Sequence, residues 1–171
     1  MRLFFALPLG ESLRGEIAVL QETWRSLGVR GNFTPKENLH ITLAFIGEYG
    51  DLEKVLDAVS KVSFSPFNLT LDGLGNFQDT YWLGTKKSPE LAGLAAKIRS
   101  SLAGSDIPYD RKRFMSHITL MRKAEFWGGV DLLLKDLPVG SMEVEEILLL
   151  RSERGKNSMI YTPVGSIKAN K

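Results

Sequence analysis

Cysteine is absent from the 171-residue chain. This absence excludes disulfide bridges, thiolate metal ligands and a cysteine nucleophile. No stretch approaches the roughly 18 uninterrupted apolar residues that a membrane-spanning helix needs. The apolar first ten residues also lack the basic segment and the small-residue cleavage pattern of a signal peptide. We therefore expect a soluble cytoplasmic protein with no membrane partner.

Low-complexity segments and recognisable linkers are absent as well. The 7 prolines and 16 glycines are scattered along the chain, and 43% of the residues are apolar. A chain of this length and composition can bury a substantial core as one unit. We expect residues 1–171 to form a single domain, possessing two lobes, and to act as a monomer.

Charge is nearly balanced overall but unevenly distributed. The formal net charge is +2, yet residues 1–85 carry a balance of −3 and residues 86–171 a balance of +5. The most basic stretch, residues 111–123, holds five positive side chains and no acid. Such a stretch favours contact with phosphate groups. It also contains one of the two histidines of the chain.

Both histidines belong to the same tetrapeptide. His-Ile-Thr-Leu occurs at residues 40–43 and again at residues 117–120. On a β-strand, alternate side chains share a face, so His40 and Thr42 would point one way and Ile41 the other. His117 and Thr119 would be arranged in the same manner. Each strand therefore presents an imidazole and a hydroxyl opposite an apolar face.

Hydrophobic periodicity predicts an α+β fold with a repeated pattern. Each His-Ile-Thr-Leu tetrapeptide lies on a predicted strand, and a helix with an apolar stripe precedes that strand. We interpret the order as two pseudo-symmetric halves, each of helices and antiparallel strands, packed around a central cleft. The predicted strands are residues 2–9, 38–47, 67–75, 80–85, 116–123, 141–153 and 158–167, and the predicted helices are 11–28, 51–62, 88–104 and a short 130–137.

Two imidazoles facing one space suit phosphodiester cleavage. A neutral ring can accept a proton while a protonated ring donates one at the same pH. The hydroxyls of Thr42 and Thr119 can donate hydrogen bonds to phosphate oxygens as charge builds on them. These residues alone do not say which of His40 and His117 is the acid and which is the base.

The histidines allow three other interpretations. A lone strand histidine is most often structural, but two identical tetrapeptides in a chain with two histidines argue against that interpretation. A catalytic zinc site needs three protein ligands, and the chain has no cysteine and no His-Glu-x-x-His motif. A Ser-His-Asp hydrolase is disfavoured because there is no Gly-x-Ser-x-Gly motif.

The segments "FTPKENLHITLAFIGE" and "RFMSHITLMRK" resemble the two HxTx motifs of the 2H phosphoesterase superfamily. The similarity is greatest to the RNA 2′,3′-cyclic phosphodiesterase (2′-5′ RNA ligase-like) family. This resemblance implies a bilobal α+β fold with both motifs lining the cleft. It also implies hydrolysis of a 2′,3′-cyclic phosphate, at an RNA 3′ end or on a nucleotide, to a 2′-phosphomonoester, without a metal or other cofactor.

The resemblance also assigns roles to individual residues. His40 would be the proton donor to the departing 3′ oxygen, and His117 would be the proton acceptor that activates water. Thr42 and Thr119 would bind the phosphate oxygens. Arg122 matches an arginine that closes the second motif, but strict alternation would turn it away from His117. Its role therefore requires the strand to end or bend near Met121.

Two departures from the family pattern leave alternatives open. Ser116 stands where a proline commonly precedes the second histidine, and residues 79–81 lack the basic residue usual before the Trp-Leu-Gly strand. An acid there, Asp79, would repel phosphate if it lay at the edge of the cleft. The alternatives are 2′-5′ RNA ligation, cleavage of a small cyclic phosphate, and a module that binds nucleotides or RNA ends without turning them over.

Overall fold

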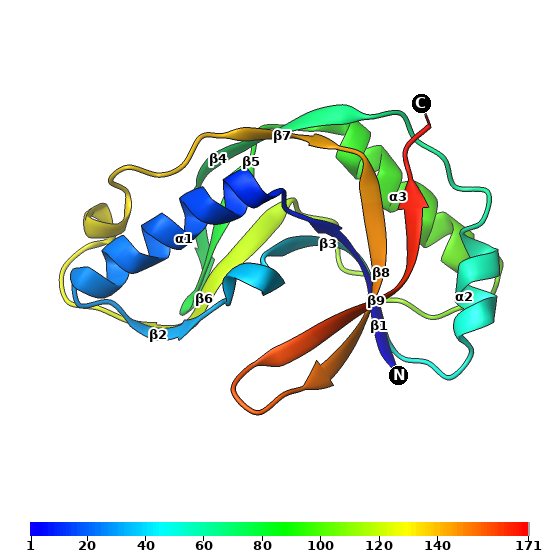
Figure 1. Ribbon diagram of the computed structural model, residues 1–171, viewed down its shortest axis with the longest axis horizontal. Helices are drawn as coiled ribbons and strands as arrows, with labels where there is room; N and C mark the ends of the chain where they lie inside the picture. The colour runs from blue at the N-terminus through cyan, green and yellow to red at the C-terminus, as the bar shows by residue number, and fades with distance from the viewer. Residues whose placement is uncertain (171) are drawn as a thin grey trace.

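Two antiparallel sheets form the framework of the protein, whose computed structural model describes residues 1–170 (Figure 1). The first sheet has the strand order β3-β1-β8-β9, and the second has the order β2-β6-β5-β4-β7. The strands are β1 (Arg2–Pro8), β2 (Arg30–Phe33), β3 (His40–Glu48), β4 (Phe67–Phe77), β5 (Thr80–Thr85), β6 (His117–Glu125), β7 (Ser141–Val144), β8 (Glu146–Arg154) and β9 (Met159–Lys168).

Three α-helices cover these sheets, as their apolar stripes predict. The helices are α1 (Glu11–Ser26), α2 (Leu52–Ala58) and α3 (Pro89–Gly104), with short 3₁₀ turns η1 (Lys36–Asn38) and η2 (Val130–Leu133). Asp51 and Ser88 cap α2 and α3 by accepting hydrogen bonds from backbone N–H groups in the first turn. The α+β class is confirmed. The predicted helix over residues 130–137 is reduced to η2.

The two lobes are interleaved in the sequence rather than being its two halves. The first sheet combines β1 and β3 from the start of the chain with β8 and β9 from its end. Helix α1 crosses to the second sheet, whereas α2 and α3 lie on the side of the first sheet (Figure 1). Ile41 and Ile118, one from each histidine strand, are fully buried in the same apolar core.

Both histidine strands contain a bulge directly after the His-x-Thr word. In β3, Leu43 is an extra residue, because Ala6 pairs with Thr42 while Phe5 pairs with Ala44. In β6, Leu120 is the extra residue between the partners of β5. Each bulge leaves two successive side chains in the core and shifts the alternation by one position. The fifth residue after each histidine, Phe45 in β3 and Arg122 in β6, is thereby returned to the face of the sheet that carries the histidine.

The sequence-based boundaries are wrong in two places. The predicted strand 141–153 is two strands, β7 and β8, which belong to different sheets. The reason is a change of phase, since the inward apolar positions are even at Met142 and Val144 and odd at Ile147 and Leu149. Strand β2 was not predicted at all. Three of its four residues are exposed, so it shows no apolar alternation.

Gly31, in β2, sits where no side chain fits. Its backbone φ is +153°, and an added Cβ would lie 2.9 Å from the carbonyl oxygens of both Arg122 and Lys123. We expect Gly31→Ala to lower the free energy of unfolding by about 1–3 kcal/mol, measured by urea denaturation. The control is Gly15→Ala in α1, where an added Cβ meets nothing within 4 Å. That change should stabilise by roughly 0.5–1 kcal/mol; equal effects from the two variants would contradict the prediction.

Within residues 1–170, no helix has both the length and the apolar character needed to cross a membrane.

Candidate active site

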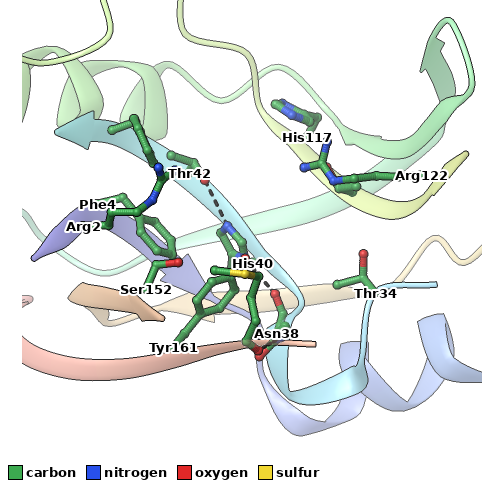
Figure 2. Close-up of a pocket in the computed structure, with 13 residues that line it drawn as sticks. Arg2, Phe4, Thr34, Asn38, His40, Thr42, His117, Arg122, Ser152 and Tyr161 are labelled. Carbon is green, nitrogen blue, oxygen red and sulfur yellow. Dashed lines mark hydrogen bonds between the residues drawn. The ribbon is translucent and has the colours of Figure 1, made fainter. Parts of the chain in front are cut away.

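A cleft of about 380 Å³ lies between the two histidine strands. It brings together all five residues that the sequence singled out, which are His40, Thr42, His117, Thr119 and Arg122. In Figure 2, His40 and Thr42 lie on one side of this space, and His117 and Arg122 lie on another. The two His-Ile-Thr-Leu tetrapeptides are thus separated by 77 positions in the chain but line one cavity.

Arg122 lines this cleft because of the bulge in β6. Leu120 and Met121 are both fully buried, so Arg122 faces the same side as His117 and Thr119. The bend near Met121 that its role requires is therefore present. In β3 the corresponding bulge brings Phe45 to the equivalent position on the opposite wall.

The rest of the lining combines polar side chains with aromatic ones and one further positive charge. Arg2 supplies a second guanidinium, and none of the described residues that line the cleft is a carboxylate. Such a site attracts anions and supplies hydrogen-bond donors to them. The lining residues that the sequence did not single out are Arg2, Phe4, Thr34, Asn38, Phe45, Ser152, Met159 and Tyr161.

The two histidines are held in the same way. The Nδ1 atom of His40 lies 2.7 Å from the carbonyl oxygen of Asn38, and that of His117 lies 3.0 Å from the carbonyl oxygen of Met115. Because a carbonyl only accepts, each Nδ1 carries the hydrogen. Both Nε2 atoms are left for proton transfer, and that of His40 lies 3.0 Å from Thr42 Oγ1. Either ring can therefore act as acid or base through Nε2.

Aromatic rings flank each imidazole. The rings of Phe4 and Tyr161 lie 5.3 and 5.4 Å from the ring of His40. The rings of Phe77 and Trp82 each lie 5.8 Å from that of His117. These neighbours restrict the rotation of both imidazole rings.

Burial lowers the pKa of His40 below its ordinary value of 6.5. The hydrogen bond to Asn38 opposes this shift, while the positive charges of His117 and Arg122 add to it. Near neutral pH the free protein therefore holds His40 mainly as the uncharged ring. A bound phosphate anion would offset the two positive neighbours and raise the pKa again.

A histidine titration by NMR tests this directly, since the chain has only two histidines to resolve. We expect the ring signal of His40 in the free protein to titrate below pH 6.5, the ordinary value. Addition of 2′-AMP should move its midpoint to higher pH, because the phosphate charge favours the protonated ring. The His40→Asn variant identifies the signal. A free-state midpoint at or above 6.5, or one that falls with 2′-AMP, would contradict the electrostatic account.

The two departures from the family pattern lie outside the chemistry of the cleft. Ser116 Oγ forms a 2.7 Å hydrogen bond with Thr85 Oγ1 of the neighbouring strand β5. Asp79 is exposed in the turn between β4 and β5 and does not line the cleft. The expected repulsion of phosphate by this acid at the edge of the cleft is therefore not supported. No cluster of three or more His, Asp or Glu side chains suited to a metal ion occurs within residues 1–170.

Comparison with known proteins agrees with this geometry. Residues 11–156 match the 2′-5′ RNA ligase superfamily. The RNA 2′,3′-cyclic phosphodiesterase of Escherichia coli K12 is 36% identical, with 95% of this chain and 93% of that protein covered. The protein of the same name from Archaeoglobus fulgidus is 33% identical, with 98% and 96% covered.

Solved structures agree as well. The crystal structure of E. coli LigT in complex with 3′-AMP has a TM-score of 0.82 and 31% identity, covering 99% of this chain and 98% of that one. The apo form has a TM-score of 0.83. Because the family match and the relatives span nearly the whole length, the chain belongs to the 2′-5′ RNA ligase superfamily of 2H phosphoesterases.

Proposed function

We propose that this protein hydrolyses the 2′,3′-cyclic phosphate at RNA 3′ ends to a 2′-phosphomonoester. The observation that carries the proposal is the pair of imidazoles lining one cleft that is free of carboxylates within the described chain, each with Nδ1 bonded to a backbone carbonyl and Nε2 left for proton transfer. The relatives at 33% and 36% identity are named RNA 2′,3′-cyclic phosphodiesterases, which are hydrolases. The substrate is an anion, and the cleft offers Arg2 and Arg122 to it.

In the proposed reaction, His117 is the base and His40 is the acid. His117 Nε2 takes a proton from water, whose oxygen attacks phosphorus as the bond from phosphorus to the 3′ oxygen breaks. His40 Nε2 gives its proton to the departing 3′ oxygen, so the products are a 3′-hydroxyl and a 2′-phosphomonoester. Thr42, Thr119 and Arg122 bind the phosphate oxygens that gain charge. Proton exchange with solvent restores both rings.

The direction of the His40 pKa shift matters for this assignment. An acid must be protonated, but the pKa of His40 in the free protein is lowered by burial and by the charge of Arg122. His117, as the base, is uncharged in the reactive state, so the negative charge of the cyclic phosphate has only Arg122 to offset. Substrate binding therefore prepares His40 to donate. The proposal needs no metal, because both proton transfers are performed by side chains.

An RNA carrying a 2′,3′-cyclic phosphate and an end label tests the proposal. Incubation with the protein in EDTA should convert the end to a 2′-phosphate, identified by chromatography against 2′- and 3′-phosphate standards. A 3′-phosphate product would show that the bond from phosphorus to the 2′ oxygen breaks, and would refute the 3′ oxygen as the leaving group. An unchanged cyclic end in EDTA, with conversion only after metal addition, would refute metal-independent catalysis.

Nucleotide complexes of the relatives favour a second candidate substrate. E. coli LigT has been crystallised with 3′-AMP and with ATP, so that protein binds single nucleotides. A cyclic mononucleotide is therefore a candidate substrate here, and the reverse reaction, 2′-5′ ligation, would use the same two histidines. Comparing kcat/KM for a cyclic-phosphate oligonucleotide and for 2′,3′-cyclic AMP distinguishes RNA from the small substrate. Incubating RNA halves, one with a cyclic phosphate and one with a 5′-hydroxyl, detects ligation.

A further inference from the structure

A polar side chain lies in the apolar stripe of helix α1. Gln21 is only 4% exposed, although Ile17, Leu20 and Trp24 on the same stripe are apolar core residues. A buried amide is unfavourable unless it is hydrogen-bonded. The Nε2 atom of Gln21 donates to the carbonyl oxygen of Leu120 at 3.0 Å and to that of Thr34 at 2.9 Å. Both of its hydrogens are thus used, and both go to the backbone.

The first acceptor, Leu120, is the extra residue of the β6 bulge. Its carbonyl oxygen also accepts the backbone N–H of Thr34 at 2.9 Å. A bulged residue leaves the regular ladder of the sheet and needs other partners for its backbone groups. Gln21 and Thr34 provide them. Arg122, which faces the cleft because of this bulge, lies two residues beyond the carbonyl that Gln21 binds.

The first motif shows the same arrangement behind its own bulge. Arg99 of α3 donates from Nε to the carbonyl oxygen of Leu43 at 2.9 Å. Its Nη1 donates to the carbonyl oxygen of Lys112 at 2.7 Å. Leu43 is the extra residue of β3, as Leu120 is of β6. Two helices of unrelated local sequence thus each bring a side-chain donor to the equivalent carbonyl.

We propose that Gln21 is a positioning residue that acts through Arg122, and that Arg99 is its counterpart behind the first motif, acting on the wall that carries Phe45. The inference rests on the proposed function, because Arg122 is taken to hold the phosphate. Loss of the Gln21 donor would let the bulge relax toward a regular register. Arg122 would then lose its alignment with the phosphate, while His117 and Thr119, which precede the bulge, would keep theirs.

A double-mutant cycle tests this with Gln21→Met, which keeps the shape of the side chain but removes both donors. We expect Gln21→Met to lower kcat/KM on a cyclic-phosphate RNA by about 10- to 100-fold, because small misplacements of a binding group are costly. In an Arg122→Ala background the same change should cost less than about threefold. If Gln21→Met only destabilised the protein, it would lower kcat/KM by the same factor in the wild-type and Arg122→Ala backgrounds.

Arg99→Met serves as the matched control, since it removes the donor behind the other bulge. Its effect on kcat/KM should be the same factor with and without Arg122. The inference would be overturned if Gln21→Met lowered kcat/KM by the same factor with and without Arg122. It would also be overturned if Arg99 were coupled to Arg122 as strongly as Gln21 is. If Gln21→Met does not fold, Gln21→Asn, whose amide is one methylene too short, replaces it.

Scoring the same cycle on affinity for 2′-AMP separates this inference from the proposed function. Wild-type protein that binds 2′-AMP but does not hydrolyse cyclic ends would refute the proposed function. Coupling between Gln21 and Arg122 in 2′-AMP affinity would still support the positioning role. Hydrolysis by the wild type, with additive effects of the two changes on rate and on affinity, would refute the positioning role alone.

Discussion

Replacement of either His40 or His117 by asparagine should lower kcat on a cyclic-phosphate RNA by about 10²- to 10⁴-fold. Asparagine keeps a polar side chain of smaller size in the cleft but can neither accept nor donate a proton near neutral pH. Both positions are only partly buried, so the fold should persist. Single-turnover kinetics in EDTA measure the chemical step, and circular dichroism with a thermal melt checks the fold.

The double replacement should fall only slightly below the weaker single variant, because one concerted transfer needs both rings. Binding of 2′-AMP within a few-fold of wild type would show that the loss is in the chemistry. Near-wild-type turnover by both single variants in EDTA would refute two-histidine catalysis. It would leave the cleft as a binding site whose reaction, if any, uses other groups.

Removal of the Arg122 guanidinium should have the next largest effect. We expect Arg122→Ala to reduce kcat by about 10²- to 10³-fold, the usual consequence of deleting a donor that stabilises charge in the transition state. Arg122→Lys should recover part of this loss, since it keeps the charge but not the paired donors. Steady-state kinetics on the labelled RNA, at fixed ionic strength, give the values.

Lys61→Ala is the control for the change in net charge. Lys61 is exposed beyond the end of α2 and does not line the cleft. Its replacement should change kcat less than about twofold, because salt screens an exposed charge that lies outside the cleft. An Arg122→Ala enzyme with activity as high as that of Lys61→Ala would show that Arg122 plays no part in holding phosphate.

Most of the secondary structure could be predicted because burial imposes a period on the sequence. Leu13, Ile17, Leu20 and Trp24 mark α1 at helical spacing, and all four are buried. The errors have equally physical causes. Strand β2 pairs with β6 at a sheet edge with exposed side chains, so no period marks it. The only sequence signal for the division between β7 and β8 is a one-residue shift in the alternation of apolar side chains.

The site was partly predictable for a different reason. The repeated His-Ile-Thr-Leu tetrapeptide predicts four of the residues that line the cleft, because the same pair of polar side chains occurs twice in one chain. These residues are His40, Thr42, His117 and Thr119. Arg2 and Tyr161 line the same cleft but lie in apolar strands near opposite ends of the chain, and only the pairing of β1, β8 and β9 brings them there. Gln21 did leave a signal, as a polar residue within an apolar stripe, but its partners are 13 and 99 positions away.

The interleaving of the sheets determines when the cleft can form during synthesis. The strand that carries His40 needs β1 beside it, and β1 in turn is flanked by β8, whose last residue is Arg154. Until residues 146–154 have left the ribosome, β1 presents an unpaired edge on the side that β8 will occupy. Such distant pairings fold slowly and leave intermediates open to misassociation. Nascent chains halted before residue 146 should therefore lack a completed first sheet, whatever the state of the second histidine strand.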